Sequence, residues 1–235
     1  MSLPAAPRAI LFDLDGTLAD TAPDLAAAVN LLRTERGLEP TDYQVLRPTA
    51  SAGARGMIGA AFGLTPEDEG FAVLRDGFFA NYQAAMAVNS GLFDGVQELL
   101  DGIEAAGLRW GVVTNKSQRF TDPLLPQIGL GHAGCAISGD TTAHAKPHPE
   151  PLLEAARRLG VAPEQCWYVG DDLRDIQAGK AAGMLTIAAG WGYAGAEEPR
   201  SWQADYLHTQ PLQLLALLRD CLGPVRNFVC RGRGS

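Results

Sequence analysis

From residue 91 onward the sequence alternates short apolar runs with longer amphipathic stretches, and this alternation constrains the fold more than any other feature. Strands that are joined by helices pair in parallel, with right-handed crossover connections. We therefore expect an α/β fold with a doubly wound parallel sheet. The predicted strands cover residues 109–114, 135–138, 166–169, 185–188 and 206–207, and the predicted helices cover 96–106, 118–128, 149–159, 173–182 and 211–222.

The first strand of the same sheet is predicted at Ala9–Phe12, and acidic residues follow it at once. Asp13 ends this strand, Asp15 comes two positions later, and Gly16 breaks the pattern. Residues two apart in an extended chain project to the same side, so both carboxylates can face one point at the carboxyl end of the strand. This arrangement could hold a cation.

Between the first strand and residue 91 the pattern predicts helices only. An insertion at this position leaves the carboxyl edge of the sheet, above the place where ligands bind in open α/β folds. We therefore expect it to form a cap that closes over the site. Its predicted helices run from the N-cap residue Thr21 to about Gly37, from Ser51 to Phe62, and from Pro66 to about Ala87.

The change of pattern sets the predicted domain boundaries. Residues 1–20 and 91–224 are expected to form the α/β core, residues 21–90 the helical cap, and residues 225–235 a disordered tail. A chain of 235 residues is long enough for one substantial core with a smaller accessory domain. The sequence is compatible with either a monomer or a homodimer.

Charge and composition exclude several classes of partner. A net charge of -8 and a pI of about 5.0 argue against nucleic acid or an anionic membrane as a partner. No apolar run reaches the roughly 20 residues of a membrane span, and no signal peptide is apparent. We therefore expect a soluble cytoplasmic protein. Its cysteines lack the spacing of a zinc site or a redox pair and are expected to be free thiols: Cys135, Cys166, Cys221 and Cys230.

Polar residues follow other predicted strands as well. Thr114 and Asn115 come directly after the apolar run that ends at Val113, and Lys146 lies in a proline-rich entry to a helix. Closely spaced carboxylates are unfavourable unless a cation or protons offset their charge. The segment after the strand at 166–169 therefore also indicates a cation, because it places three carboxylates within five residues: Asp171, Asp172 and Asp175.

Taken in order, these residues resemble the four motifs of the haloacid dehalogenase-like hydrolase superfamily. The motifs are Asp13-x-Asp15-Gly16-Thr17, then Thr114, then Lys146, then Gly170-Asp171-Asp172 with Asp175. The resemblance covers nearly the whole chain, and the helical insertion is similar to the small cap of this superfamily. It implies a Rossmann-like core and a Mg²⁺-dependent phosphatase that hydrolyses a small organic phosphate monoester through an aspartyl-phosphate.

The resemblance implies catalytic and substrate-binding roles for five residues. Asp13 would be the nucleophile, and Asp15 would protonate the leaving alkoxide and then deprotonate the attacking water. The repulsion between a carboxylate and an anionic phosphate must be offset by nearby cations and hydrogen-bond donors. Thr114 and the backbone amide of Asn115 would hold phosphoryl oxygens, and Lys146 would offset the negative charge at the nucleophile.

The resemblance also implies a Mg²⁺ site. Mg²⁺ prefers octahedral oxygen ligands and keeps several waters. Asp13, the backbone carbonyl of Asp15 and Asp171 would supply the protein ligands. Asp175 would orient these ligands, and Asp172 would lie farther out or in solvent.

The acidic residue at position 15 narrows the reaction, because dehalogenase members of the superfamily lack it. An aspartate there implies a phosphatase or a phosphomutase. A mutase cap usually supplies a dedicated acid/base pair, whereas residues 21–90 contain neither histidine nor lysine, which favours hydrolysis. A non-catalytic phosphate-binding regulator is a further alternative. A dinucleotide-binding enzyme fits poorly, because no Gly-x-Gly-x-x-Gly follows the first strand.

Within the superfamily the chain is similar to the phosphoglycolate phosphatase branch. The segment Ser51–Met57 and the two motifs around Thr114 and Asp171 also resemble bacterial phosphatases that act on N-acetylmuramic acid 6-phosphate. Both substrates carry a carboxylate and a phosphate. Arg55 could pair with such a carboxylate, although a solvated arginine is the alternative, and Arg55 does not distinguish the two substrates.

Overall fold

A six-stranded parallel sheet forms the centre of the computed structural model, which describes residues 3–193 and 198–223. The strand order is β5-β4-β1-β6-β7-β8, and every neighbouring pair is parallel. This sheet confirms the predicted α/β fold class. The strands are β1 (Ala9–Phe12), β4 (Arg109–Val113), β5 (Ala136–Ile137), β6 (Cys166–Gly170), β7 (Leu185–Ala189) and β8 (Tyr206–His208).

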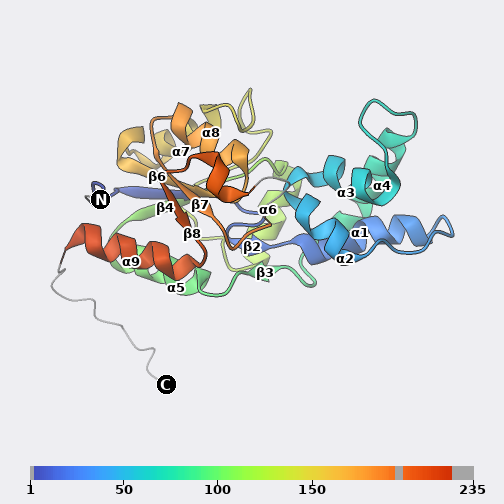
Figure 1. The fold of residues 1–235 in the computed structure, drawn as a ribbon, viewed down its shortest axis with the longest axis horizontal. Helices are drawn as coiled ribbons and strands as arrows, with labels where there is room; N and C mark the ends of the chain where they lie inside the picture. The colour runs from blue at the N-terminus through green and yellow to red at the C-terminus, as the bar shows by residue number, and fades with distance from the viewer. Residues whose placement is uncertain (1–2, 194–197, 224–235) are drawn as a thin grey trace, which may run out of the picture.

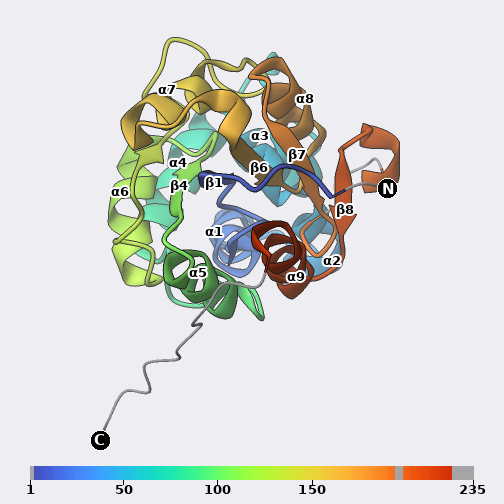
Figure 2. The same cartoon turned by 90° about the vertical axis from the view of Figure 1, so that its left-hand side faces the viewer.

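Helices cover both faces of this sheet (Figure 2). The helices α7 (Glu150–Leu159) and α8 (Leu173–Ala181) lie on one face, and α5 (Val96–Ala105) and α9 (Pro211–Leu222) lie together on the other. Because both faces are covered, central strands such as β1 and β6 are fully buried and read as continuous apolar runs. The helix α6 (Gln118–Gln127) connects β4 to β5.

The strand order places a topological switch point at the centre of the sheet. From β1 the chain moves outward to β4 and β5, and it then returns to the other side of β1 to form β6, β7 and β8. The loops that follow β1 and β6 therefore diverge and leave a crevice at the carboxyl ends of these strands. The backbone N–H of Asp13 donates to the carbonyl of Val169 at 2.9 Å, which holds the two strand ends side by side.

The segment between β1 and β3 packs as a group of helices beyond the carboxyl ends of the strands (Figure 1). The helices α1, α3 and α4 contact one another and bury side chains such as Leu25, Met57 and Phe78 between them. The helices are α1 (Ala22–Thr34), α2 (Tyr43–Leu46), α3 (Gly53–Phe62) and α4 (Phe71–Ala84), with a 3₁₀ turn at Arg47–Ala52.

The start of α4 differs from the predicted start after Pro66. Asp68 accepts hydrogen bonds from both the backbone N–H and the hydroxyl of Thr65, at 2.7 and 2.9 Å, and its own carbonyl accepts from Phe71. This turn delays the helix by several residues. The short α2 and the 3₁₀ turn were not predicted, since four to six residues are too few to show a helical period.

A two-stranded antiparallel ribbon joins the two ends of the helical segment. It pairs β2 (Ala19–Asp20) with β3 (Gly91–Leu92), and Asp20 lies opposite Gly91. Strands of two residues leave no alternation in the sequence, so this ribbon was not predicted. We propose it as the boundary between a core of residues 1–20 and 91–224 and a cap of residues 21–90.

In the part of the chain that the structure describes, none of the helices combines the length and the hydropathy that crossing a membrane would require. The cysteines at 135, 166 and 221 are free thiols, as predicted. The predicted disordered tail at 225–235, which includes Cys230, lies outside the described residues.

Candidate active site

The polar residues singled out in the sequence converge at the carboxyl ends of β1, β4 and β6. A cavity of about 370 Å³ opens there between the sheet and the helical segment. Its walls include Asp13, Asp15, Thr114 and Lys146 from the strand ends and the loop before α7. The helical segment contributes residues 50–54 and the aromatic side chains of α4. Residues far apart in the sequence thus share one chamber.

Lys146 is the central cation of this cavity. Its ammonium lies 2.8 Å from Asp13 Oδ1 and 2.7 Å from Asp175 Oδ1, and it donates to the carbonyl of Val113 at 2.9 Å. The Lys146 side chain is only 3% exposed. Burial alone would lower its pKa, but the charges of Asp13 and Asp175 outweigh burial and raise the pKa. Lys146 therefore stays protonated and fixes the two carboxylates.

The negative charge of the cluster exceeds what Lys146 can balance. Carboxylate oxygens of Asp13, Asp171 and Asp175 lie within 4.8 Å of one another, and all three residues are buried. Burial, helped by the charge of Asp175 and opposed by the attraction of Lys146, raises the pKa of Asp13 to about 7. Burial and the charges of Asp13 and Asp175 raise the pKa of Asp171 well above its usual value. The ionised cluster is therefore short of positive charge.

A bound metal ion would supply the positive charge that the cluster lacks. Asp13 Oδ1 is buried and accepts no hydrogen bond of standard geometry from any described residue, although it pairs with Lys146. Asp171 is held by the hydroxyls of Thr17 and Ser51 and by the backbone N–H of Tyr193, at 3.0, 3.2 and 3.0 Å. Carboxylate oxygens are the ligands that hard divalent cations prefer. The buried Asp13 carboxylate and the oriented Asp171 carboxylate together suit such a cation.

Only glycine can occupy position 16 in this arrangement. Gly16 has φ +88°, a backbone conformation that side chains other than glycine rarely adopt. A Cβ atom on Gly16 would also lie 2.1 Å from Asp171 Oδ2, far inside van der Waals contact. The tight turn lets the loop after β1 approach the end of β6, so that Asp13 and Asp171 can share a ligand.

Asp15 is held through a single carboxylate oxygen. Oδ1 accepts from the hydroxyl of Thr21 at 2.5 Å and from the ammonium of Lys116 at 2.9 Å. Thr21 is the N-cap residue of α1, as predicted, but its side chain makes no capping hydrogen bond. Its hydroxyl is used by Asp15 instead. Both contacts leave Oδ2 available for a substrate atom.

Thr114 and Asn115 shape the loop at the end of β4. Thr114 is buried, and its hydroxyl accepts from the backbone N–H of Lys116 at 3.2 Å. The side-chain amide of Asn115 pairs with the backbone of Lys146 in both directions, at 2.9 Å each. The resemblance implies a phosphoryl-binding role for the backbone amide of Asn115. The structure adds that the side chain of Asn115 positions the loop that carries Lys146.

Asp172 begins α8 rather than entering the acidic cluster. Its side chain accepts from the backbone N–H of Arg174, while Asp175 accepts from the backbone N–H of Asp172, a reciprocal capping box. Burial would raise the pKa of Asp172, but hydrogen bonds from the Arg174 guanidinium lower it. Arg174 also donates to the carbonyl of Ser51 at 2.9 Å, which ties the 3₁₀ turn of the helical segment to α8.

The structure does not bring Arg55 to the cavity. Arg55 is exposed on α3, whereas the residues just before it, Ala52 to Ala54, line the wall. Among the described residues the cationic side chains that line the cavity are Lys116, Lys146 and Arg174. Lys116 was not predicted as a site residue, because a single lysine after a strand gives no indication that it is buried.

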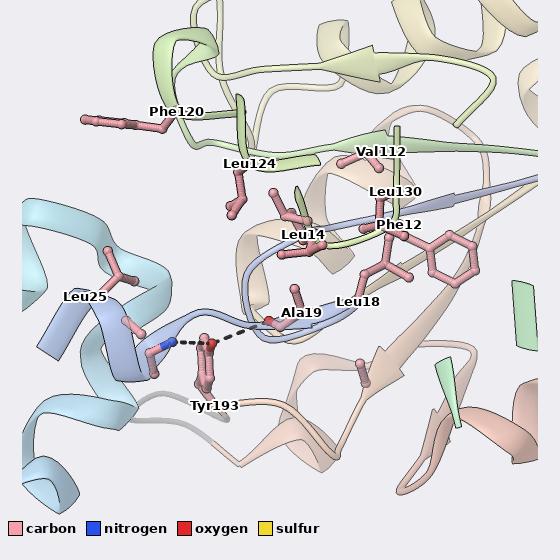
Figure 3. Close-up of a cluster of buried hydrophobic side chains, with 14 of the residues drawn as sticks. Phe12, Leu14, Leu18, Ala19, Leu25, Val112, Phe120, Leu124, Leu130 and Tyr193 are labelled. Atoms are coloured by element: carbon pink, nitrogen blue, oxygen red, sulfur yellow. Dashed lines mark hydrogen bonds between the residues drawn. The ribbon is translucent and has the colours of Figure 1, made fainter. Parts of the chain in front are cut away.

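The loop after β7 supports the site through Tyr193, which was not predicted as a site residue. The hydroxyl of Tyr193 accepts from the backbone N–H groups of Thr21 and Ala22, at 2.7 and 2.9 Å. Tyr193 is buried beside the apolar cluster that contains Phe12 and Leu18 (Figure 3). It therefore packs in the core while anchoring the start of α1.

This fold and site define a hydrolase of the haloacid dehalogenase-like family, to which the chain belongs: the model of this family matches residues 7–183. The match confirms the resemblance seen in the four motifs. A relative from Xanthomonas campestris pv. campestris, named phosphoglycolate phosphatase, is 50% identical over 211 residues, which cover 88% of this chain and 95% of the relative.

Two further proteins are similar over nearly their whole length. The N-acetylmuramic acid 6-phosphate phosphatase of Pseudomonas putida is 45% identical over 217 residues, which cover 92% of this chain and 97% of the relative. The crystal structure of a predicted phosphoglycolate phosphatase from Haemophilus somnus matches with a TM-score of 0.80 and 26% identity. That match covers 90% of this chain and 98% of the solved chain.

Proposed function

We propose that this protein hydrolyses a small organic phosphate monoester through an aspartyl-phosphate on Asp13. The observation that carries the proposal is the pair of carboxylates after β1. Asp13 is buried against Lys146, while Asp15 is held through Oδ1 by Thr21 and Lys116. A module that only binds phosphate needs no second carboxylate here, whereas hydrolysis needs both a nucleophile and a proton carrier.

The reaction divides into two displacements at phosphorus. In the first, an Asp13 oxygen forms a bond to phosphorus, the ester P–O bond breaks, and Asp15 gives its proton to the leaving alkoxide. In the second, Asp15 takes a proton from water, the water oxygen attacks phosphorus, and inorganic phosphate leaves with Asp13 restored. Thr114 and the backbone amide of Asn115 bind the phosphoryl oxygens, and Lys146 offsets the negative charge at the nucleophile throughout.

We propose Mg²⁺ as the metal, held by Asp13, the backbone carbonyl of Asp15 and Asp171, with Asp175 holding Lys146 against the cluster. When bound, it supplies positive charge that offsets the repulsion between the nucleophile and the phosphate. The buried cluster of Asp13, Asp171 and Asp175, whose negative charge Lys146 alone does not balance, supports this assignment.

Mg²⁺ is expected to stabilise the folded protein. Saturation to about 100 times Kd stabilises a protein by about 2.7 kcal/mol, which a thermal melt resolves easily. Bound ligands must be deprotonated, and the pKa of Asp13 without metal is about 7, so the rise in Tm should be larger at pH 8 than at pH 5.5. Asp171→Asn should remove the rise, and Asp94→Asn, at an exposed carboxylate, should keep it. An unchanged rise in Asp171→Asn would contradict the proposed site.

We propose 2-phosphoglycolate as the substrate, with N-acetylmuramic acid 6-phosphate as the alternative. The similarity to a phosphoglycolate phosphatase over most of both chains supports the first, and the similarity to an N-acetylmuramic acid 6-phosphate phosphatase supports the second. The test is Mg²⁺-dependent phosphate release from each ester, with the Asp13→Asn protein as the blank. We expect kcat/KM to be about 100-fold higher for 2-phosphoglycolate, equivalent to about 2.7 kcal/mol. The reverse preference would assign the alternative, and no release from either ester would contradict the proposed activity.

We further propose that the protein acts in the cytoplasm on small phosphorylated molecules, without a nucleic-acid or membrane partner. The net charge of -8 supports this, since both kinds of partner are polyanionic.

A further inference from the structure

Lys116 is a buried cation in the cavity wall that the reaction described above does not use directly. Its side chain is only 7% exposed, and its ammonium lies 2.9 Å from Asp15 Oδ1 and 4.7 Å from the ring centroid of Tyr82. Burial alone would lower the pKa of Lys116, but the neighbouring Asp15 and Tyr82 raise it. The cavity therefore carries a permanent positive charge beside the proposed proton carrier.

We propose that the Lys116 ammonium binds a carboxylate of the substrate and thereby selects phosphate esters of 2-hydroxy acids. This inference rests on the proposed phosphatase function and names the substrate class for the same site. In such esters the carboxylate is attached to the carbon that bears the ester oxygen.

The position of Lys116 in the cavity wall supports this role. Its ammonium is buried beside Asp15, the residue proposed to contact the leaving group. A buried cation at this place favours a leaving group that carries a negative charge over one that does not.

The short distance between Lys116 and Asp15 sets where the carboxylate must lie. Asp15 has to contact the ester oxygen in order to protonate it, and Lys116 lies 2.9 Å from Asp15. In a 2-hydroxy acid ester the ester oxygen and the nearer carboxylate oxygen are about 3 Å apart, from ordinary bond lengths. One ammonium can therefore contact both Asp15 and the carboxylate. In a sugar acid whose carboxylate lies across the ring from the phosphate, it cannot.

The other cationic side chains of the described wall are engaged elsewhere. The Lys146 ammonium contacts Asp13, Asp175 and the carbonyl of Val113. Arg174 holds Asp172 through two of its nitrogens and donates to a backbone carbonyl. Lys116, by contrast, has Asp15 as its carboxylate partner and Tyr82 as its other polar neighbour among the described residues, so an ammonium with three N–H groups can still donate to a ligand.

The aromatic wall strengthens the expected contact. Phe79 and Tyr82 from α4 pack against Phe120 from α6 along the cavity, in a tilted and an edge-to-face contact with ring centroids 5.3 and 5.4 Å apart. They shield Lys116 from water. A charge-assisted hydrogen bond is stronger in such a place than at an open surface.

The test compares 2-phosphoglycolate with ethyl phosphate, which has the same ester linkage but no carboxylate. Lys116→Met should lower kcat/KM for 2-phosphoglycolate about 30- to 100-fold more than for ethyl phosphate, the range of a lost hydrogen bond to a charged group. Lys116→Arg should restore part of the preference, because it restores the charge. Lys180→Met, at an exposed lysine of α8, should leave both rates unchanged.

Two outcomes would overturn the inference. An equal loss on both substrates in Lys116→Met would mean that Lys116 only positions Asp15. If Arg55→Met lost the preference for 2-phosphoglycolate over ethyl phosphate while Lys116→Met kept it, Arg55 and not Lys116 would bind the carboxylate.

A binding measurement separates this inference from the proposed function. In the Asp13→Asn background, calorimetry in the presence of a chelator should show tighter binding of 2-phosphoglycolate than of ethyl phosphate, and the added Lys116→Met should abolish that difference. If the wild-type protein released phosphate from neither ester, the proposed function would be wrong. The titration would still show whether Lys116 binds the carboxylate. A difference that survives Lys116→Met would contradict the subsite even in an active phosphatase.

Discussion

Replacing Asp13 with asparagine is expected to lower kcat for phosphate release by at least about 10⁴-fold, the usual scale for loss of a nucleophile. The amide is a poor nucleophile and lacks the charge that a metal ligand needs. Its shape matches the carboxylate, so the chamber around Lys146 should be preserved. Single-turnover and steady-state phosphate release with Mg²⁺ measure this loss. Asp94→Asn, at an exposed carboxylate outside the cavity, serves as the matched control and should keep wild-type rates.

The same substitution should raise the stability of the metal-free protein at pH 8. Burial raises the pKa of Asp13 from 3.8 to about 7, so the folded state favours the protonated form. The stability from this group is complete below about pH 4 and is lost as the pH rises through 7. Asparagine does not ionise, so Asp13→Asn should melt higher than wild type at pH 8 and about equally at pH 4. A lower Tm at pH 8 in chelator would contradict this reading of the cluster.

Replacing Lys146 with methionine is expected to lower kcat by about 10³-fold and to destabilise the fold. The catalytic loss follows from removing the cation that balances the phosphoryl group and the nucleophile, an effect of about 10²- to 10³-fold for a single donor. The stability loss follows because Asp13 and Asp175 would remain buried without their shared partner, and breaking such a pair costs about 3–5 kcal/mol.

The destabilisation in Lys146→Met should grow with pH. At pH 5 the buried carboxyl group of Asp13 can take up a proton, because burial already raises its pKa to about 7 with Lys146 present. At pH 8 it must ionise without a nearby ammonium. Thermal melts of the metal-free protein at both pH values measure the difference, with Lys180→Met as the exposed control. A loss of Tm that is equal at the two pH values would show that Lys146 acts through packing alone.

The predicted fold and the predicted convergence of motifs both rest on the parallel sheet. Parallel strands place all their carboxyl ends at one edge, so residues that follow strands must gather there wherever they lie in the sequence. For this reason the sequence alone places Asp13, Thr114 and Asp171 close together. The two-residue strands of the β2–β3 ribbon could not be predicted, because they are shorter than the period that would reveal them.

What the sequence by itself determined was therefore the sheet, the helical insertion and the set of residues at the strand ends. Only the tertiary structure decided which side chains those residues contact. It directed the hydroxyl of the N-cap residue Thr21 to Asp15, left Arg55 in solvent, and buried Lys116 between Asp15 and Tyr82. Periodicity reports the face on which a residue lies. The surroundings of a single side chain depend on the elements that pack over it, as Asp15 and Tyr82 do over Lys116, and no local pattern predicts them.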